Sequence, residues 1–538
     1  MKLSKSGASL FLQLLFLCVF NLSMAEVQRP NILLVVLDDL NDFVGHMGGH
    51  PQAKTPNIDS LADQGVAFIN AHSNAAVCIP SRGSFMTGIC PTTSRFYGFE
   101  NIRKNETLMH CKTMPQYARE NGYQTFTTGK VFHTPRRNLW DDNGIAPEYG
   151  PFAFNGKKIT LHPDVPGDFS YFGVLDGTFI SLAKVPDVPA SEAGPGYTGW
   201  DNLANKTPFH YVDETDRDAM PDERSAQWAV EKIRRLETGD KTDPFFMTVG
   251  FMRPHTPLVV PQKYFDMYPL ETLQLPVIRE GDRTDTYLED GTDSRGRRMY
   301  ATLLDAYGGD PDKALRHYVQ AYLASVTFAD EMVGKVMEAL DRSRFRDNTI
   351  VVLTSDHGYH MGEKDFLFKY SLWEESTRVP FIVRHPDYEH QAGSRVAHPI
   401  ALVDLFPSII DFCSWQGETQ ISEKGAPIDG FSVKPFLEQP DGGTWDGPNC
   451  ALSIRSSWVT KAINKQHLSL RSRDFRYIRY HKPKGGKFEE LYDHRKDPNE
   501  WKNLAEDPDY KTVIAAMRKE LDRRLAPAVA RQQGQRNL

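Results

Sequence analysis

Residues 75–83 hold the side chains whose order most suggests chemistry. Cys78 is followed by Pro80 and Arg82, and proline is typical of a first helical turn, where its missing N–H would have no intrahelical partner. A helix that opens here places Cys78 at its N-terminus, where free N–H groups and the helix dipole favour an anion. Arg82 can offer its planar guanidinium to an oxyanion. The segment predicts a sulfate or phosphate site; the alternative is a buried or reactive thiol.

Two apolar segments, which read as buried strands, each end in potential metal ligands. The run ILLVVL precedes Asp38 and Asp39, and the run TIVVLTS precedes Asp356 and His357. Ligands of α/β sheets gather beyond the carboxyl ends of the strands, so these side chains are expected to share a divalent cation. Oxygen-rich sets suit calcium, or second to it magnesium, better than zinc. The alternative for each aspartate is a helix cap in an acidic loop.

Basic side chains follow further predicted strands. Lys130 and His133 come just after the strand QTFTT, and His255 follows the strand FFMTVGF. Together with Lys369 and Arg82 they would surround the cation with positive or proton-donating groups, and such a pocket binds a tetrahedral anion. Taken singly, each lysine or histidine is more simply explained as a solvated surface residue.

A sheet has to bring these residues together, and strands alternate with helices over most of the chain. Helices are predicted at 56–64, 115–121, 221–236 and 311–340. This alternation indicates an α/β fold with a large wound, mixed but mainly parallel sheet and helices on both faces. The tail reads as antiparallel strands followed by an amphipathic helix, which predicts a small C-terminal α+β subdomain with an antiparallel sheet.

The expected domain organisation has three parts. Residues 1–25 read as a signal peptide, residues 26–440 as the catalytic domain and residues 441–538 as the C-terminal subdomain. Within the catalytic domain, residues 134–218 lose periodicity and are rich in Pro, Gly, Asn and aromatic side chains. Long irregular insertions in compact domains are commonly functional, so this one is expected to form a wall of the substrate pocket.

The first residues of the chain have the features of a secretory leader. Lys2 and Lys5 precede an apolar core, and Ser23-Met24-Ala25 forms a small-x-small cleavage pattern. The alternative is an uncleaved anchor, for which the apolar core is short. No later segment could cross a bilayer, so no stable membrane insertion is expected. The predicted location is the periplasm or the exterior, or the lysosome if the source is an animal.

The charge of the chain limits its possible partners, and its cysteine content limits its possible disulfides. Lys and Arg number 63 against 70 Asp and Glu, a formal charge of −7, which does not indicate a nucleic-acid partner. Besides Cys78, the mature chain contains Cys90, Cys111, Cys413 and Cys450. These can form up to two disulfides in an oxidising compartment, and their spacing does not reveal the pairing.

Several short words of the sequence, taken together, resemble formylglycine-dependent sulfatases of the alkaline-phosphatase superfamily. They are VLDD (36–39), CIPSR (78–82), GKVFH (129–133), RPHTP (253–257), TSDHG (354–358) and ELYDHRKDPNE (490–500). The word GKVFH and the His357 that follows Asp356 are most similar to the iduronate-2-sulfatase branch.

This resemblance implies a role for each candidate residue. Cys78 would be oxidised to formylglycine by a formylglycine-generating maturation enzyme, and the aldehyde hydrate would be the nucleophile. The ligands of one calcium ion would be Asp38, Asp39, modified Cys78, Asp356 and His357. Arg82 and Lys130 would steady the hydrate with His133 beside it. His255 and Lys369 would grip the sulfate and help to protonate the leaving alcohol.

The function that follows is a sulfuric ester hydrolase acting on a sulfated polysaccharide or oligosaccharide. The sequence differs from the iduronate branch at His360, at Lys364 and in the insertion at 134–218. The resemblance therefore does not specify which sugar carries the sulfate. One alternative is a phosphonate or phosphate monoester hydrolase that uses the same site. Another is a catalytically silent protein that binds sulfated glycans.

Overall fold

The computed structural model describes residues 29–154, 158–188, 197–202, 207–239, 243–287, 295–457, 460–482 and 486–536. Its centre is a sheet of eight strands in the order β19-β2-β18-β14-β1-β12-β4-β5. The strands in that order are Ser394–Val396, Val66–Phe68, Phe381–Arg384, Thr349–Ser355, Asn31–Asp38, Phe245–Pro254, Gln124–Gly129 and Asp142–Asn143. Strand β18 runs antiparallel to both of its neighbours, and the other pairings are parallel. The predicted wound, mainly parallel sheet is confirmed.

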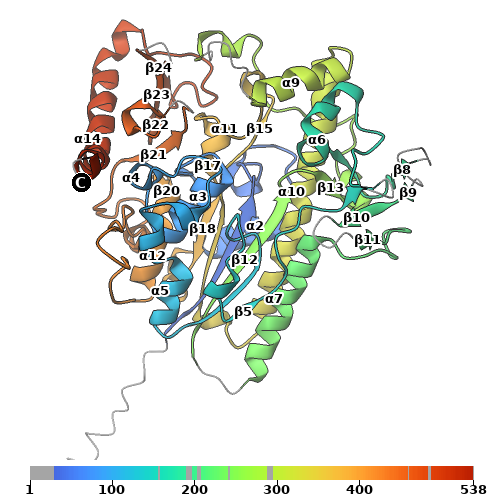
Figure 1. The fold of residues 1–538 in the computed structure, drawn as a ribbon, viewed down its shortest axis with the longest axis horizontal. Helices are drawn as coiled ribbons and strands as arrows, with labels where there is room; N and C mark the ends of the chain where they lie inside the picture. Colours follow the sequence, from blue (N-terminus) through green and yellow to red (C-terminus); the bar gives the residue numbers. More distant parts are fainter. Residues whose placement is uncertain are drawn as a thin grey trace, which may run out of the picture.

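Helices cover both faces of this sheet (Figure 1). Side chains of β1 alternate between two cores: Leu33 and Val35 face one, and Ile32 and Leu34 face the other. The first core is closed by α2 (Pro56–Gln64), α7 (Pro221–Thr238) and α10 (Pro311–Asp341), and the second by α3 (Cys78–Thr87), α5 (Met114–Glu120) and α12 (Leu405–Phe412). Burial on both faces explains why β1, β12 and β14 are almost continuously apolar.

The C-terminal part forms a separate layer at the upper left of Figure 1. Its four-stranded antiparallel sheet consists of β21 (Cys450–Arg455), β22 (His467–Ser472), β23 (Phe475–His481) and β24 (Lys487–Asp493). Helix α14 (Lys511–Arg536) packs Met517 and Leu521 against Leu452 and Leu470 of this sheet. The antiparallel C-terminal sheet is therefore confirmed, whereas the boundary at residue 440 stays a prediction.

The segment 134–218 contains several short strands rather than regular layers. Strands β6 (Phe152–Ala153), β10 (Trp200–Asn202) and β11 (Thr207–Phe209) form a small antiparallel sheet. Strand β7 (Phe179–Ser181) pairs with β13 (Leu258–Val260), which follows β12 in the chain. This pairing anchors the segment next to the end of a central strand. Its role as a substrate wall stays a prediction.

Two further expectations concern the leader and the cysteines. The signal peptide at 1–25 lies outside the described residues, whose helices are too short or too polar to cross a bilayer.

Cys90, Cys111, Cys413 and Cys450 are buried free thiols. The disulfides that the sequence permitted are thus not formed, and packing of the cores holds the fold together.

Candidate functional site

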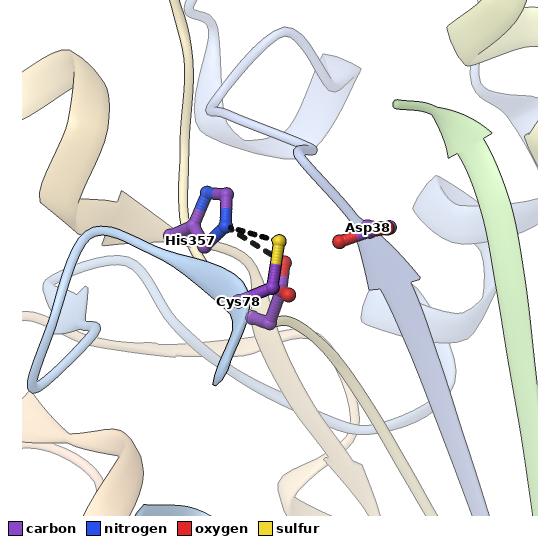
Figure 2. Close-up of side chains that lie close together, drawn as sticks. Asp38, Cys78 and His357 are labelled. Carbon is purple, nitrogen blue, oxygen red and sulfur yellow. Dashed lines mark hydrogen bonds and ion pairs between the residues drawn. The ribbon is translucent and has the colours of Figure 1, made fainter. Parts of the chain in front are cut away.

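The predicted site residues come together at the carboxyl edge of the central sheet. Asp38 ends β1, and Asp356 follows β14, which pairs with β1 in parallel. Cys78 is the first residue of α3 and is buried beside them. Figure 2 shows Asp38, Cys78 and His357 arranged around a common space. Segments more than 270 residues apart in the chain, such as those that carry Cys78 and His357, therefore meet at one place.

Cys78 lies at the centre of the cluster. Its Sγ is 3.2 Å from His357 Nε2, 3.6 Å from Lys369 Nζ and 3.8 Å from Lys130 Nζ. Burial, together with the nearby Asp38 carboxylate, raises the pKa of the Cys78 thiol. Since the thiolate is the reactive form of cysteine, the unmodified side chain is a poor nucleophile despite its central position.

Each lysine of the site forms an ion pair with one aspartate at the end of β1. Lys369 Nζ is 2.7 Å and 2.8 Å from the two carboxylate oxygens of Asp39. Lys130 Nζ donates a short hydrogen bond to Asp38 Oδ2. All four side chains are buried, so these charges neutralise one another with little screening from water.

Arg82 connects the strand ends. Its Nε donates to Asp356 Oδ2 at 2.8 Å, and a terminal nitrogen donates to Asp38 Oδ1 at 3.2 Å. The remaining terminal nitrogen donates to the carbonyl oxygens of Lys130 and Val131. The guanidinium thus acts as a clamp between β1, β14 and the end of β4, and its direct contact with a bound anion stays a prediction.

The carboxylates have unequal tendencies to ionise. Burial opposes ionisation of Asp38, but the positive charges of Lys130, Arg82 and Lys369 outweigh it and hold the pKa of Asp38 well below its usual range. Burial raises the pKa of Asp356 to about 6, although Arg82 offsets part of this effect. Burial likewise raises the pKa of Asp39, an effect that Lys369 opposes and the other two carboxylates reinforce. A divalent cation among them would relieve this repulsion.

The histidines are neutral in this environment. Burial first, and Lys369 next, hold the pKa of His255 and of His357 well below the usual range. In His357, Nδ1 is 3.0 Å from the Gly358 carbonyl, which can only accept a hydrogen bond. The lone pair of Nε2 consequently faces Cys78. Burial and Lys130 lower the pKa of half-buried His133 to about 4.

Around Cys78, potential ligand atoms gather in two overlapping groups. Asp38, Cys78, Asp356 and His357 each offer an atom within 4.8 Å of the others, and so do Asp39, Cys78 and His255. Carboxylate oxygens dominate the combined set, which suits a hard cation such as calcium. The donor chemistry therefore fits a calcium ion.

Sequence reasoning missed Tyr149. Its hydroxyl is 3.2 Å from Lys130 Nζ, and its ring packs edge-on against His255 with ring centroids 5.1 Å apart. A terminal nitrogen of buried Arg253 donates to the Tyr149 carbonyl at 3.2 Å and so holds the backbone in place. Tyr149 lies in the irregular segment 134–218, where no periodic pattern or motif distinguished it.

Comparison with known proteins gives concordant results. Residues 30–413 match the family described as Sulfatase, and residues 362–526 match the family described as N-sulphoglucosamine sulphohydrolase, C-terminal. A sulfatase of Formosa agariphila is 30% identical over 500 residues, which cover 92% of this chain and 86% of that protein. The iduronate 2-sulfatase of Homo sapiens is 32% identical over 406 residues, 73% of this chain and 65% of that enzyme.

Solved structures share the fold at lower identity. A phosphonate monoester hydrolase of Agrobacterium radiobacter has a TM-score of 0.63 at 22% identity, covering 93% of this chain and 96% of its own. A 2-O GAG sulfatase has a TM-score of 0.61 at 22% identity, covering 95% of this chain and 94% of its own. The match to the family over most of the chain confirms the resemblance read from the motifs: the protein belongs to the sulfatase family and is a sulfuric ester hydrolase.

Proposed function

We propose that this sulfatase removes sulfate from a sulfated carbohydrate by means of a formylglycine hydrate made from Cys78. The observation that carries the proposal is the environment of Cys78. Its sulfur is buried among two lysines and His357, at the N-terminus of α3, yet burial keeps the thiol protonated. The surrounding cations suit an anionic substrate, whereas the protonated thiol is a poor nucleophile. Both features are explained if the nucleophile is a modified form of Cys78 rather than the thiol itself.

Formylglycine would supply a geminal diol, of which one hydroxyl attacks sulfur and the other permits release of sulfate when the aldehyde is rebuilt. The calcium ion would supply a Lewis acid that lowers the pKa of that hydroxyl. Its ligands in this proposal are Asp38, Asp39, modified Cys78, Asp356 and His357. Arg82 fixes the separation of Asp38 and Asp356 through its two hydrogen bonds.

The two lysines have different roles in this mechanism: Lys369, with His255, grips the sulfate, and Lys130, with Arg82, steadies the hydrate. Their Nζ atoms lie within 4 Å of the Cys78 sulfur, and a cation bound by Asp38 and Asp39 would free part of their charge for the substrate. His133, neutral and half-buried, is placed to accept a proton from the second hydroxyl.

His255 is the proposed donor to the leaving alcohol. Its Nδ1 is 2.5 Å from the Thr256 carbonyl, so Nε2 is the nitrogen available to the site. The neutral ring would take up a proton when an anionic substrate binds beside it, because a neighbouring negative charge favours the imidazolium. It can then pass that proton to the departing sugar oxygen.

The substrate class and location complete the proposal. The similarity to iduronate 2-sulfatase and the fold shared with a 2-O GAG sulfatase support a sulfated polysaccharide or oligosaccharide. Residues 26–440 would form the catalytic domain, residues 441–538 the C-terminal subdomain, and residues 134–218 a pocket wall. The leader would direct export to the periplasm or exterior, or to the lysosome in an animal, and a formylglycine-generating enzyme would be the maturation partner.

Two measurements test this function. A panel of sulfated mono- and disaccharides, with matched sulfate and phosphate esters, should show faster turnover of sulfate esters. A preference for phosphate or phosphonate esters would favour the alternative function, a phosphonate or phosphate monoester hydrolase. The phosphonate monoester hydrolase of Agrobacterium radiobacter has the same fold.

Cys78→Ser should abolish turnover while leaving the fold intact, and mass spectrometry of the Cys78 peptide should detect the aldehyde. A variant with near-normal rates would refute the mechanism. An unmodified thiol in a protein that binds sulfated glycans without hydrolysing them would support the silent-binder alternative.

A further inference from the structure

A second group of titratable side chains lies apart from the active site. It forms where the hairpin of β15 (His360–Met361) and β16 (Leu367–Phe368) approaches α11 (Glu374–Thr377). His360 Nδ1 is 3.8 Å from Glu363 Oε2 and 3.8 Å from Glu375 Oε2. We call His360, Glu363 and Glu375 the hairpin triad.

Two polar atoms of the hairpin triad are buried without a partner. Among the described residues, neither His360 Nδ1 nor Glu375 Oε2 has a hydrogen-bond partner, and His360 has no exposed surface. The ring of His360 is held at its other nitrogen, because Nε2 is 2.7 Å from Ser371 Oγ. Buried polar atoms are almost always paired, so two unpaired atoms that face each other indicate a missing ligand.

The neighbouring charges do not balance the triad. Glu374 pairs with Arg471 and Arg476, and Asp42 pairs with Arg378. By contrast, no lysine or arginine of the described chain lies within ion-pair distance of Glu363 or Glu375.

Burial adds to this imbalance at both glutamates. It raises the pKa of Glu363 to about 7. The pKa of Glu375 is raised further by burial and by repulsion from Glu363. Burial thus opposes the charged form of both carboxyl groups, and the nearby charge of Lys364 offsets this only in part at Glu375.

An ion can reach the triad without passing through the active site. Glu363 and Glu375 line a cavity of about 490 Å³ between the catalytic part and the C-terminal sheet. Arg378, His494 and Asp474 lie on other parts of its wall, and none of the active-site residues lines it. The cavity therefore gives access to the two glutamates, whereas fully buried His360 is not part of its wall.

We propose that His360, Glu363 and Glu375 bind a divalent transition-metal ion of the zinc type. An imidazole with two carboxylates is a donor set that zinc accepts. The contact from His360 Nε2 to Ser371 is the outer hydrogen bond that usually orients a ligating histidine. Tetrahedral zinc at about 2.1 Å from its ligands separates them by about 3.4 Å, so each glutamate would have to approach His360 Nδ1 from its 3.8 Å distance, and the two carboxylates would also have to close on each other.

The proposed ion would tie the hairpin to α11, and the segment between these ligands carries Lys369. It would therefore steady the loop that presents Lys369 to Cys78. This is a site additional to the calcium cluster, and its existence does not depend on the proposed reaction.

Zinc binding by the full-length, chelator-treated protein tests the proposal. The Asp38→Asn/Asp356→Asn background removes ligands of the other cluster, and one Zn²⁺ per chain should still bind. Adding Glu375→Gln or His360→Gln should weaken binding by at least about tenfold, the smallest loss usual even for an outer residue. Asp474→Asn, another carboxylate that lines the cavity, is the matched control and should bind Zn²⁺ as the background does.

Absence of Zn²⁺ binding, or equal affinity with and without Glu375→Gln and His360→Gln, would overturn the proposal. Anomalous scattering at the zinc edge gives a second measurement on the unaltered protein, so the test does not rely on the variants folding. Crystals soaked in Zn²⁺ should show a peak between His360 Nδ1 and the two glutamates. Saturating Zn²⁺ with no peak there would also overturn it.

Discussion

Replacing Lys369 by methionine would show whether Asp39 is a ligand of the proposed calcium ion. Lys369 Nζ contacts both carboxylate oxygens of Asp39, and both residues are buried. Removing one partner of a buried ion pair costs about 3–5 kcal/mol, because the remaining group is left buried either as an unpaired charge or in a protonation state it would not have in water. Lys369→Met should therefore lower the free energy of unfolding by about that amount in the presence of a chelator.

Calcium should reverse much of this loss. A cation at 100 times its dissociation constant stabilises a protein by about 2.7 kcal/mol. The variant should gain more than the wild type, because Lys369 no longer competes with the cation for Asp39. Denaturant unfolding of both proteins, with chelator and with saturating calcium, measures the difference.

Lys364→Met is the matched control. Lys364 is also fully buried, and its Nζ is 2.9 Å from Asp282 Oδ1, away from the calcium cluster. This variant should be destabilised to a similar extent but should gain no more from calcium than the wild type does. An equal calcium gain in Lys369→Met and wild type would refute the assignment of Asp39 as a ligand.

Two further substitutions test other contacts. Tyr149→Phe removes a hydrogen bond to charged Lys130, worth about 1.5–3 kcal/mol, so the free energy of unfolding should fall by no more than that amount and kcat/KM should fall about tenfold or more; an unchanged kcat/KM would exclude a role for the hydroxyl. Glu500 is buried, which opposes its ionisation, but Arg476 and His494 lower its pKa to about 2. Because this folded-state pKa lies below the unfolded value, Glu500 stabilises the protein above about pH 4.5 and the contribution disappears as the pH falls towards 2. Glu500→Gln should cost about 3 kcal/mol at neutral pH and flatten acid unfolding monitored by circular dichroism; an acid transition identical to that of the wild type would contradict this.

Much of the fold and of the site can be predicted from the sequence, because these features depend on local patterns. Strands β1 and β14 are buried on both faces, so they appear as unbroken apolar runs. The polar residues directly after them must then lie at one edge of a parallel sheet. The motif around Cys78 likewise specifies a helix start, and α3 begins at Cys78 itself.

Pairings between side chains depend instead on which strands are neighbours, and the order β14-β1-β12-β4 does not follow the chain. That order brings Lys130 to Asp38 and directs Arg82 into hydrogen bonds with two carboxylates. It also leaves the cysteines unpaired. Tyr149 gains its surroundings from Lys130 and from His255 on another strand, so no local pattern could reveal it. Periodicity and motifs indicate which side of each segment is buried. Which segments contact one another is decided only when the helices and the sheet pack together.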